Sequence, residues 1–117
     1  MQYDLEERTA KYSEEIIIFI KNIKKDLLNE NILKQLLKSA TSIGANYYEA
    51  NNASSKRGFK NKIYISKKEA NETKYWLRLL GKTSPESDKQ IKILWKEAQE
   101  LNMIFQKIVN TSNKKTP

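Results

Sequence analysis

Residues 32–53 read ILKQLLKSATSIGANYYEANNA, and their apolar positions recur at alternating steps of three and four residues. This spacing is typical of one face of an α-helix. The face consists of Leu33, Leu36, Ala40, Ile43 and Tyr47. Gly44 lies inside the same segment, where a glycine costs about 1 kcal/mol of helix stability relative to alanine. A glycine here indicates that another backbone passes close to this helix.

Two later stretches show the same spacing. Residues 56–80 carry it at Phe59, Ile63, Ser66, Ala70, Thr73, Leu77 and Leu80. Residues 85–109 carry it at Ile91, Leu94, Ala98, Leu101, Phe105 and Ile108. Between them, Gly81 is predicted to be the C′ residue of one helix, and Ser84 followed by Pro85 is predicted to be the N-cap of the next.

A further helix is predicted near the N-terminus. It begins at Asp4, with Glu7 three residues on as the second half of a capping box. Its apolar face is predicted to be Leu5, Tyr12, Ile16, Phe19, Ile23 and Leu27. The polar residues Asn29, Glu30 and Asn31 are expected to end it.

Four helices of roughly 20 to 25 residues with short connections predict an all-α fold, an antiparallel up-down-up-down four-helix bundle. We expect residues 1–109 to form this single domain. Residues 110–117 are expected to be a polar, basic tail without fixed structure.

The chain has 117 residues, no cysteine and no histidine. Disulfides, zinc fingers and Cys or His nucleophiles are therefore excluded, and we expect neither an enzyme nor a cofactor. No apolar run approaches the roughly 20 residues needed to span a bilayer. The acidic N-terminal segment does not resemble a signal peptide. We expect a cytoplasmic protein with no membrane partner.

The stretch from Gln35 to Ala50 resembles a signature of a bacterial four-helix-bundle family, known from proteins encoded within intervening sequences of 23S ribosomal RNA genes. Residues 62–77 and the opening residues 3–6 resemble that family as well, so the resemblance covers about residues 3–109. It implies a homopentameric ring. It also implies similarity to the accessory variability determinant of diversity-generating retroelements, a basic pentameric barrel that binds nucleic acid and partners a reverse transcriptase. It supplies no catalytic residue.

Polar side chains lie beside the apolar faces of the two middle helices. The set consists of Ser39, Ser42, Asn46, Glu49, Glu69 and Glu72, together with Trp76. We interpret it as a polar network or a subunit interface, since an unpaired buried carboxylate is costly. A metal site at the three glutamates, a small-ligand pocket and solvated carboxylates are the alternatives. The metal site is disfavoured because the di-iron bundles pair glutamate with histidine.

The positive charge is concentrated in one segment. The chain has 22 basic and 14 acidic residues, and residues 56–81 hold eight of the basic ones against two acidic ones. Such clustering is typical of phosphate-backbone binding, although a solvated lysine-rich face is the alternative. The candidate nucleic-acid-binding residues are Lys56, Arg57, Lys60, Lys62, Lys67, Lys68 and Lys74.

Two tryptophans lie off the main apolar faces. Trp76 is predicted to lie at a subunit interface and Trp95 to pack in the core. Charge, fold and resemblance together favour a non-enzymatic homo-oligomer that acts as an RNA- or DNA-binding or ribonucleoprotein accessory. The alternative is a structural or protein-interaction oligomer without a nucleic-acid role.

Overall fold

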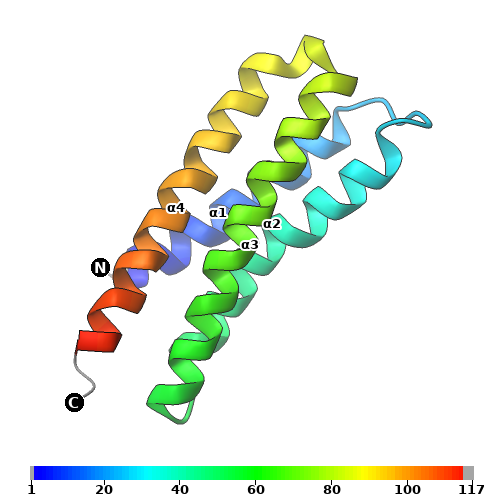
Figure 1. Ribbon diagram of the computed structural model, residues 1–117. Coiled ribbons are helices and arrows are strands. Elements are labelled where there is room, and N and C mark those ends of the chain that lie inside the picture. The colour runs from blue at the N-terminus through cyan, green and yellow to red at the C-terminus, as the bar shows by residue number, and fades with distance from the viewer. Residues whose placement is uncertain (1, 115–117) are drawn as a thin grey trace.

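The computed structural model describes the backbone of residues 2–114 and the side chains of residues 4–113. Within this range the chain forms four α-helices, one short 3-10 helix and no strand. The elements are α1 (Gln2–Lys21), α2 (Glu30–Asn51), α3 (Lys56–Thr83), η1 (Pro85–Ser87) and α4 (Asp88–Lys114). Successive helices run in opposite directions, as the predicted bundle requires (Figure 1).

The apolar faces predicted from the sequence form the core. Burial of these side chains is the main force that holds the helices together. Within this core Tyr47 and Phe105 pack against each other, with 5.7 Å between their ring centroids. The largest fully buried side chains are Tyr12, Tyr47, Phe105, Ile16, Leu36, Ile43, Ile63, Leu77, Leu80, Leu94, Leu101 and Val109.

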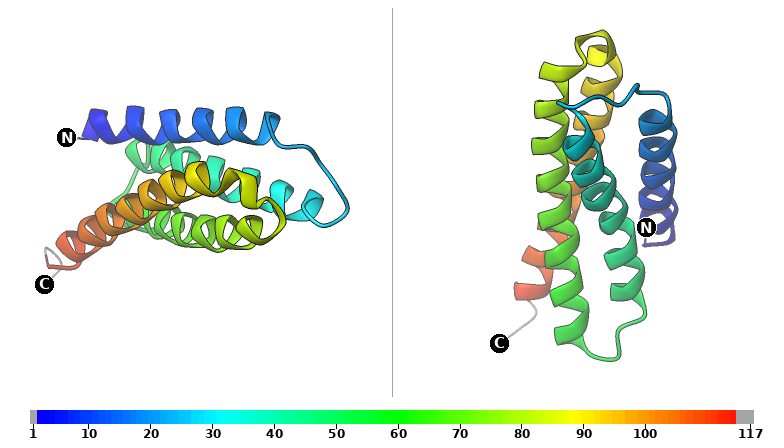
Figure 2. Two further views of the ribbon diagram at one scale, coloured as in Figure 1. Left: turned by 90° about the horizontal axis from the view of Figure 1, so that it is seen from above. Right: turned by 90° about the vertical axis from the view of Figure 1, so that its right-hand side faces the viewer.

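Helices α1 and α3 lie on opposite sides of the bundle (Figure 2). Helix α3 packs along both α2 and α4, whereas α1 packs mainly along α2. Polar contacts join α1 to α4. Arg8 forms ion pairs with Glu97 and Glu100, and the buried Tyr12 hydroxyl donates to the carbonyl of Leu94 at 2.8 Å.

The glycine within α2 lies directly against helix α1. A Cβ at Gly44 would lie 3.3 Å from the Thr9 carbonyl carbon and oxygen, and 3.3 Å from the Thr9 Cβ. This contact with α1 confirms that another backbone passes close to Gly44.

The limits of α1 differ from the prediction. Because the helix already includes Gln2, Asp4 lies in its first turn and the capping box predicted with Glu7 is wrong. The helix ends at Lys21, and Leu27 is 93% exposed instead of buried. Side-chain hydrogen bonds of Asp26 and Asn29 set a turn in the following loop, and apolar spacing does not reveal such a turn.

The α3–α4 connection differs as well. Gly81 lies inside α3, which continues to Thr83, so the predicted C′ role of Gly81 is wrong. The helix ends just before Pro85, a residue that disfavours helical conformation at the position preceding it. Ser84 is buried and its side chain makes no capping bond, and η1 precedes α4.

Helix α4 extends beyond the predicted domain boundary. It continues to Lys114, so residues 110–114 are helical where an unstructured tail was expected, while residues 115–117 lie outside the described residues. The buried Val109 anchors the last turns to the core. None of the described helices is long and apolar enough to cross a membrane.

Candidate nucleic-acid interface

The first turn of α3 carries two exposed cations. Ser55 caps the helix, and its hydroxyl accepts a hydrogen bond from the Gly58 amide at 3.0 Å. The cap starts the helix at Lys56 and Arg57, with no acidic residue in the first turn. Because a helix N-terminus is itself electropositive, cations there are unfavourable for the helix and favourable for a bound anion.

Five of the seven candidate cations lie on the outward and α4 sides of α3. Arg57 and Lys68 share the outward side, about three turns apart, and Lys60 and Lys67 share the side toward α4, about two turns apart. None of the set forms an ion pair with a described residue. We call this set the basic surface; it consists of Lys56, Arg57, Lys60, Lys67 and Lys68.

Lys74 also lies on the side of α3 that faces α4, but its ammonium already contacts two α4 side chains. Its ammonium lies 5.3 Å above the Trp95 ring centroid and donates a hydrogen bond to the side-chain carbonyl of Gln99. Trp95 is 40% exposed, so the prediction that it packs in the core is wrong. Its ring instead supports the stem and charge of a lysine.

Lys62 lies on the other side of α3 and is paired. Its ammonium is 2.7 Å from the Glu49 carboxylate of α2. Exposed pairs of this kind contribute little to stability. The carboxylate nevertheless neutralises the charge that Lys62 would offer to an outside anion. The structure therefore separates Lys62 from the other candidates.

The polar stripe of α2 and α3 divides into a buried and an exposed part. The buried hydroxyls of Ser39 and Thr73 hydrogen-bond to each other at 3.0 Å, and the buried Ser66 hydroxyl donates to the Ile43 carbonyl at 2.9 Å. Of the predicted stripe, only Ser39 takes part in these buried contacts, whereas Ser66 and Thr73 had been placed on the apolar face. The sequence did carry a signal for these buried contacts, because Ser66 and Thr73 place hydroxyl groups on the otherwise apolar face of the helix.

Contacts within a single helix engage four other stripe residues: Ser42, Asn46, Glu72 and Trp76. Ser42 donates to the Lys38 carbonyl at 2.7 Å, and Asn46 donates to the Ser42 carbonyl at 2.8 Å. The Trp76 indole donates to the Glu72 carboxylate at 3.0 Å within α3. These groups line the exposed edge between α2 and α3 without converging on one point.

Glu69 is a partly buried carboxylate of the stripe. Its pKa is raised, first by burial and then by the nearby Glu72, while Lys68 and Lys38 oppose the shift. Among the described side chains, no group of three or more acidic residues is placed to hold a metal ion.

Helix α4 adds a row of amides beside the basic surface, which the sequence analysis missed. Asn102 donates to the Lys67 carbonyl at 3.0 Å, and Gln106 donates to the side chain of Asn110 at 2.9 Å. Together with Gln99, these amide residues recur at steps of three and four, so the sequence alone could have placed them on one side of the helix. Side-chain amides are common donors to phosphate oxygens.

An all-helical, antiparallel four-helix bundle with one strongly basic helix is the class that this architecture defines. The chain belongs to the 23S rRNA-intervening sequence protein family, whose model matches residues 2–107. It is similar to a protein of unknown function from the S23 ribosomal protein family of Bacteroides thetaiotaomicron VPI-5482, known from a crystal structure. The two share 33% identity with a TM-score of 0.80, over 94% of this chain and 99% of that chain. No curated protein matches, and neither description names an enzyme activity.

Proposed function

We propose that this protein is a non-enzymatic, homo-oligomeric nucleic-acid or ribonucleoprotein accessory that binds the phosphate backbone through the basic surface. One observation carries the proposal. Helix α3 has nine basic and two acidic side chains, and only Lys62 of the nine is in a salt bridge with a described residue.

The chemistry of the surface favours phosphate over base edges. Four of its five cations are lysines, which act as point charges, while reading of base edges relies on bidentate arginine or amide contacts in a groove. Phosphate neutralisation releases counterions, so binding is strongly salt-dependent and tolerant of sequence. The α4 amides supply neutral donors beside the charges.

Homopentameric assembly is part of the proposal and rests on the resemblance to the intervening-sequence proteins. A ring would repeat the basic surface five times, and several weak phosphate contacts on one nucleic acid multiply into useful avidity. In a ribonucleoprotein, the protein partner would be an enzyme acting on the same nucleic acid, such as a reverse transcriptase.

The test is a binding titration with structured RNA and with duplex DNA at two salt concentrations. The test variant changes all five residues of the basic surface to glutamate. We expect wild type to bind both nucleic acids weakly, more tightly at low salt, and the variant to lose binding.

A matched control variant changes five exposed lysines elsewhere to glutamate, with the same change in net charge: Lys11, Lys21, Lys34, Lys89 and Lys96. It should retain most of the binding. If wild type does not bind at low salt, or if the two variants lose binding equally, the basic surface is not a nucleic-acid site. The alternative function, a structural or protein-interaction oligomer, then applies.

A further inference from the structure

The loop between α1 and α2 presents two leucines to solvent. Leu27 is 93% exposed and Leu28 is 72% exposed. Single exposed apolar side chains are common on protein surfaces, but an adjacent pair at the tip of a loop forms a protruding apolar knob. Lys24 and Lys25 stand beside it, exposed and outside any ion pair with the described residues.

The knob is held on a fixed loop. The Asp26 carboxylate accepts hydrogen bonds from the amides of Leu28 and Asn29, each at 2.9 Å. The buried Asn29 side chain accepts from the Asp26 amide at 2.9 Å and donates to the Lys24 carbonyl at 3.0 Å. A loop fixed in this way loses little conformational entropy when its tip docks.

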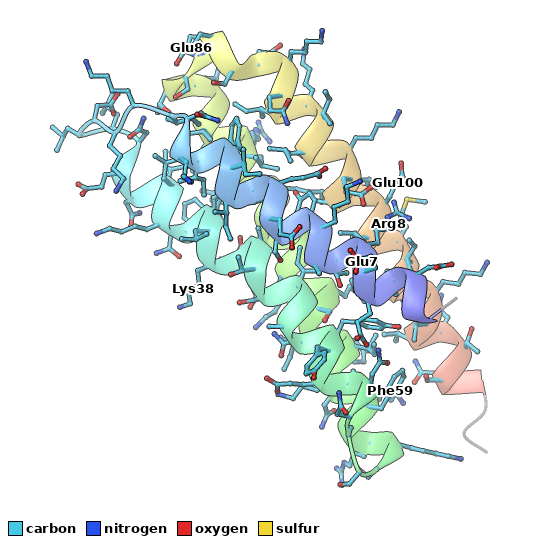
Figure 3. All side chains as sticks on the ribbon, turned by 180° about the vertical axis from the view of Figure 1, so that it is seen from behind. Glu7, Arg8, Lys38, Phe59, Glu86 and Glu100 are labelled. Carbon is cyan, nitrogen blue, oxygen red and sulfur yellow. The ribbon has the colours of Figure 1, made fainter. Side chains whose placement is uncertain are left out.

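A groove of about 600 Å³ runs between α1 and α2. Besides three glutamates, its lining consists of small side chains and one tyrosine: Thr9, Ala10, Ser13, Thr41, Gly44, Ala45 and Tyr48. The small residues that let α1 lie close to α2 also leave the space between the two helices open. Figure 3 shows the two helices side by side on this face, with Glu7 on α1.

The groove also carries acidic side chains, which complement the cations of the knob. Glu6, Glu7 and Glu14 line the groove, and none of them forms an ion pair with a described residue. The knob thus combines an apolar tip with two cations, and the groove combines a lining of small side chains and a tyrosine with three anions. Such complementarity gives a contact its orientation and its partner choice.

A chain cannot fill its own groove with its own knob. Ala45 lies fifteen residues beyond the start of α2, which is about 20 Å along the helix. The complementary occupant is therefore a second copy of the chain.

We propose that the Leu27–Leu28 knob of one copy docks in the α1–α2 groove of the next. The proposal rests on the self-association included in the proposed function and is independent of nucleic-acid binding. Because knob and groove are different surfaces, such contacts join copies head to tail and can close into a ring.

The absence of native cysteine allows a direct test by disulfide trapping. Leu27→Cys protein is mixed with Ala45→Cys protein under mild oxidation, and covalent heterodimer is measured on a denaturing gel. We expect the covalent heterodimer to form rapidly. A disulfide needs Cα atoms within about 7 Å of each other, and docking of the knob in the groove would bring the two cysteines that close. Leu27→Cys mixed with Asn71→Cys, an exposed position on α3, is the control and should give only slow background.

A charge swap keeps the test independent of cysteine chemistry. Adding Lys24→Glu and Lys25→Glu to the Leu27→Cys protein should abolish trapping. Adding Glu7→Lys and Glu14→Lys to the Ala45→Cys protein should then restore it. Trapping that is no faster than the Asn71 control, or that ignores both charge reversals, would overturn the proposal.

The double variant Leu27→Cys/Ala45→Cys separates this proposal from pentamer formation. A ladder of covalent species ending at five chains supports both. A ladder ending at two keeps the knob–groove contact and overturns the pentamer. A protein whose light-scattering mass is five chains but which gives no intermolecular product overturns the contact alone.

Discussion

Helices α1 and α3 face opposite sides of the same bundle and differ in charge. Helix α1 carries five acidic and three basic side chains, whereas α3 carries two acidic and nine basic ones. Apolar burial holds both helices, but the charge of Arg8 also joins α1 to α4. In α3, only Lys62 of the nine basic side chains forms an ion pair with a described residue, so the packing of this helix depends little on its charge.

The same contrast recurs within α3. On the side toward α2, Lys62 pairs with Glu49 and the hydroxyl of Thr73 meets Ser39. On the outward and α4 sides, the basic surface has no ionic partner among the described residues. Position around the helix, not position in the sequence, decides which lysines are available.

The largest expected effect is on the α1 side. Replacing Gly44 with leucine should destabilise the protein by about 1–3 kcal/mol, because the side chain would be forced against the Thr9 backbone. The matched change Gly81→Leu meets nothing within 4 Å of its Cβ. It should stabilise α3 by about 0.8 kcal/mol through helix propensity. Chemical denaturation measures both, and a stabilised Gly44 variant would show that the two helices separate easily.

The next effect probes how α3 is attached to α2. Thr73→Val keeps the shape and removes the buried hydroxyl, so we expect a loss of about 1 kcal/mol in the free energy of unfolding. Thr41→Val is the control, because that hydroxyl bonds only to carbonyls of its own helix. Equal values for the two variants would contradict a role for the Thr73–Ser39 hydrogen bond in joining the helices.

The smallest effect concerns Glu69, an acid on the basic helix. Burial raises its pKa, so the folded state holds the proton more tightly than the unfolded state. Ionisation at neutral pH therefore costs stability, and this cost disappears as the pH falls and the group is protonated. Glu69→Gln should melt slightly higher than wild type at pH 7, with the difference vanishing under acid conditions. A difference that grows on acidification would reverse the assigned sign.

Periodicity predicts the helices and most of the core because both depend on which side chains avoid water. It fails where side-chain hydrogen bonds decide the backbone. Asp26 and Asn29 build the loop after α1, which leaves Leu27 exposed although its spacing fits the helix. Pro85, rather than Gly81, sets the end of α3.

The candidate site is predicted only in part. Composition identifies α3 as the basic helix, and the spacing of its lysines could assign each to a side. The side chains that pair with these lysines could not be predicted from the spacing. The Lys62–Glu49 pair and the Lys74–Trp95 contact each join two helices, and their register is fixed by packing of the whole bundle.

The measurement that tests the central claim most directly is the salt dependence of RNA binding for Lys67→Gln and Lys62→Gln beside wild type. In a plot of log affinity against log salt concentration, each neutralised phosphate contributes about 0.9 to the slope. Loss of Lys67 from the basic surface should lower the slope by about that amount for each phosphate that it contacts, and loss of the paired Lys62 should leave it unchanged. Equal slopes for wild type and the Lys67 variant, or a larger change for the Lys62 variant, would contradict the account.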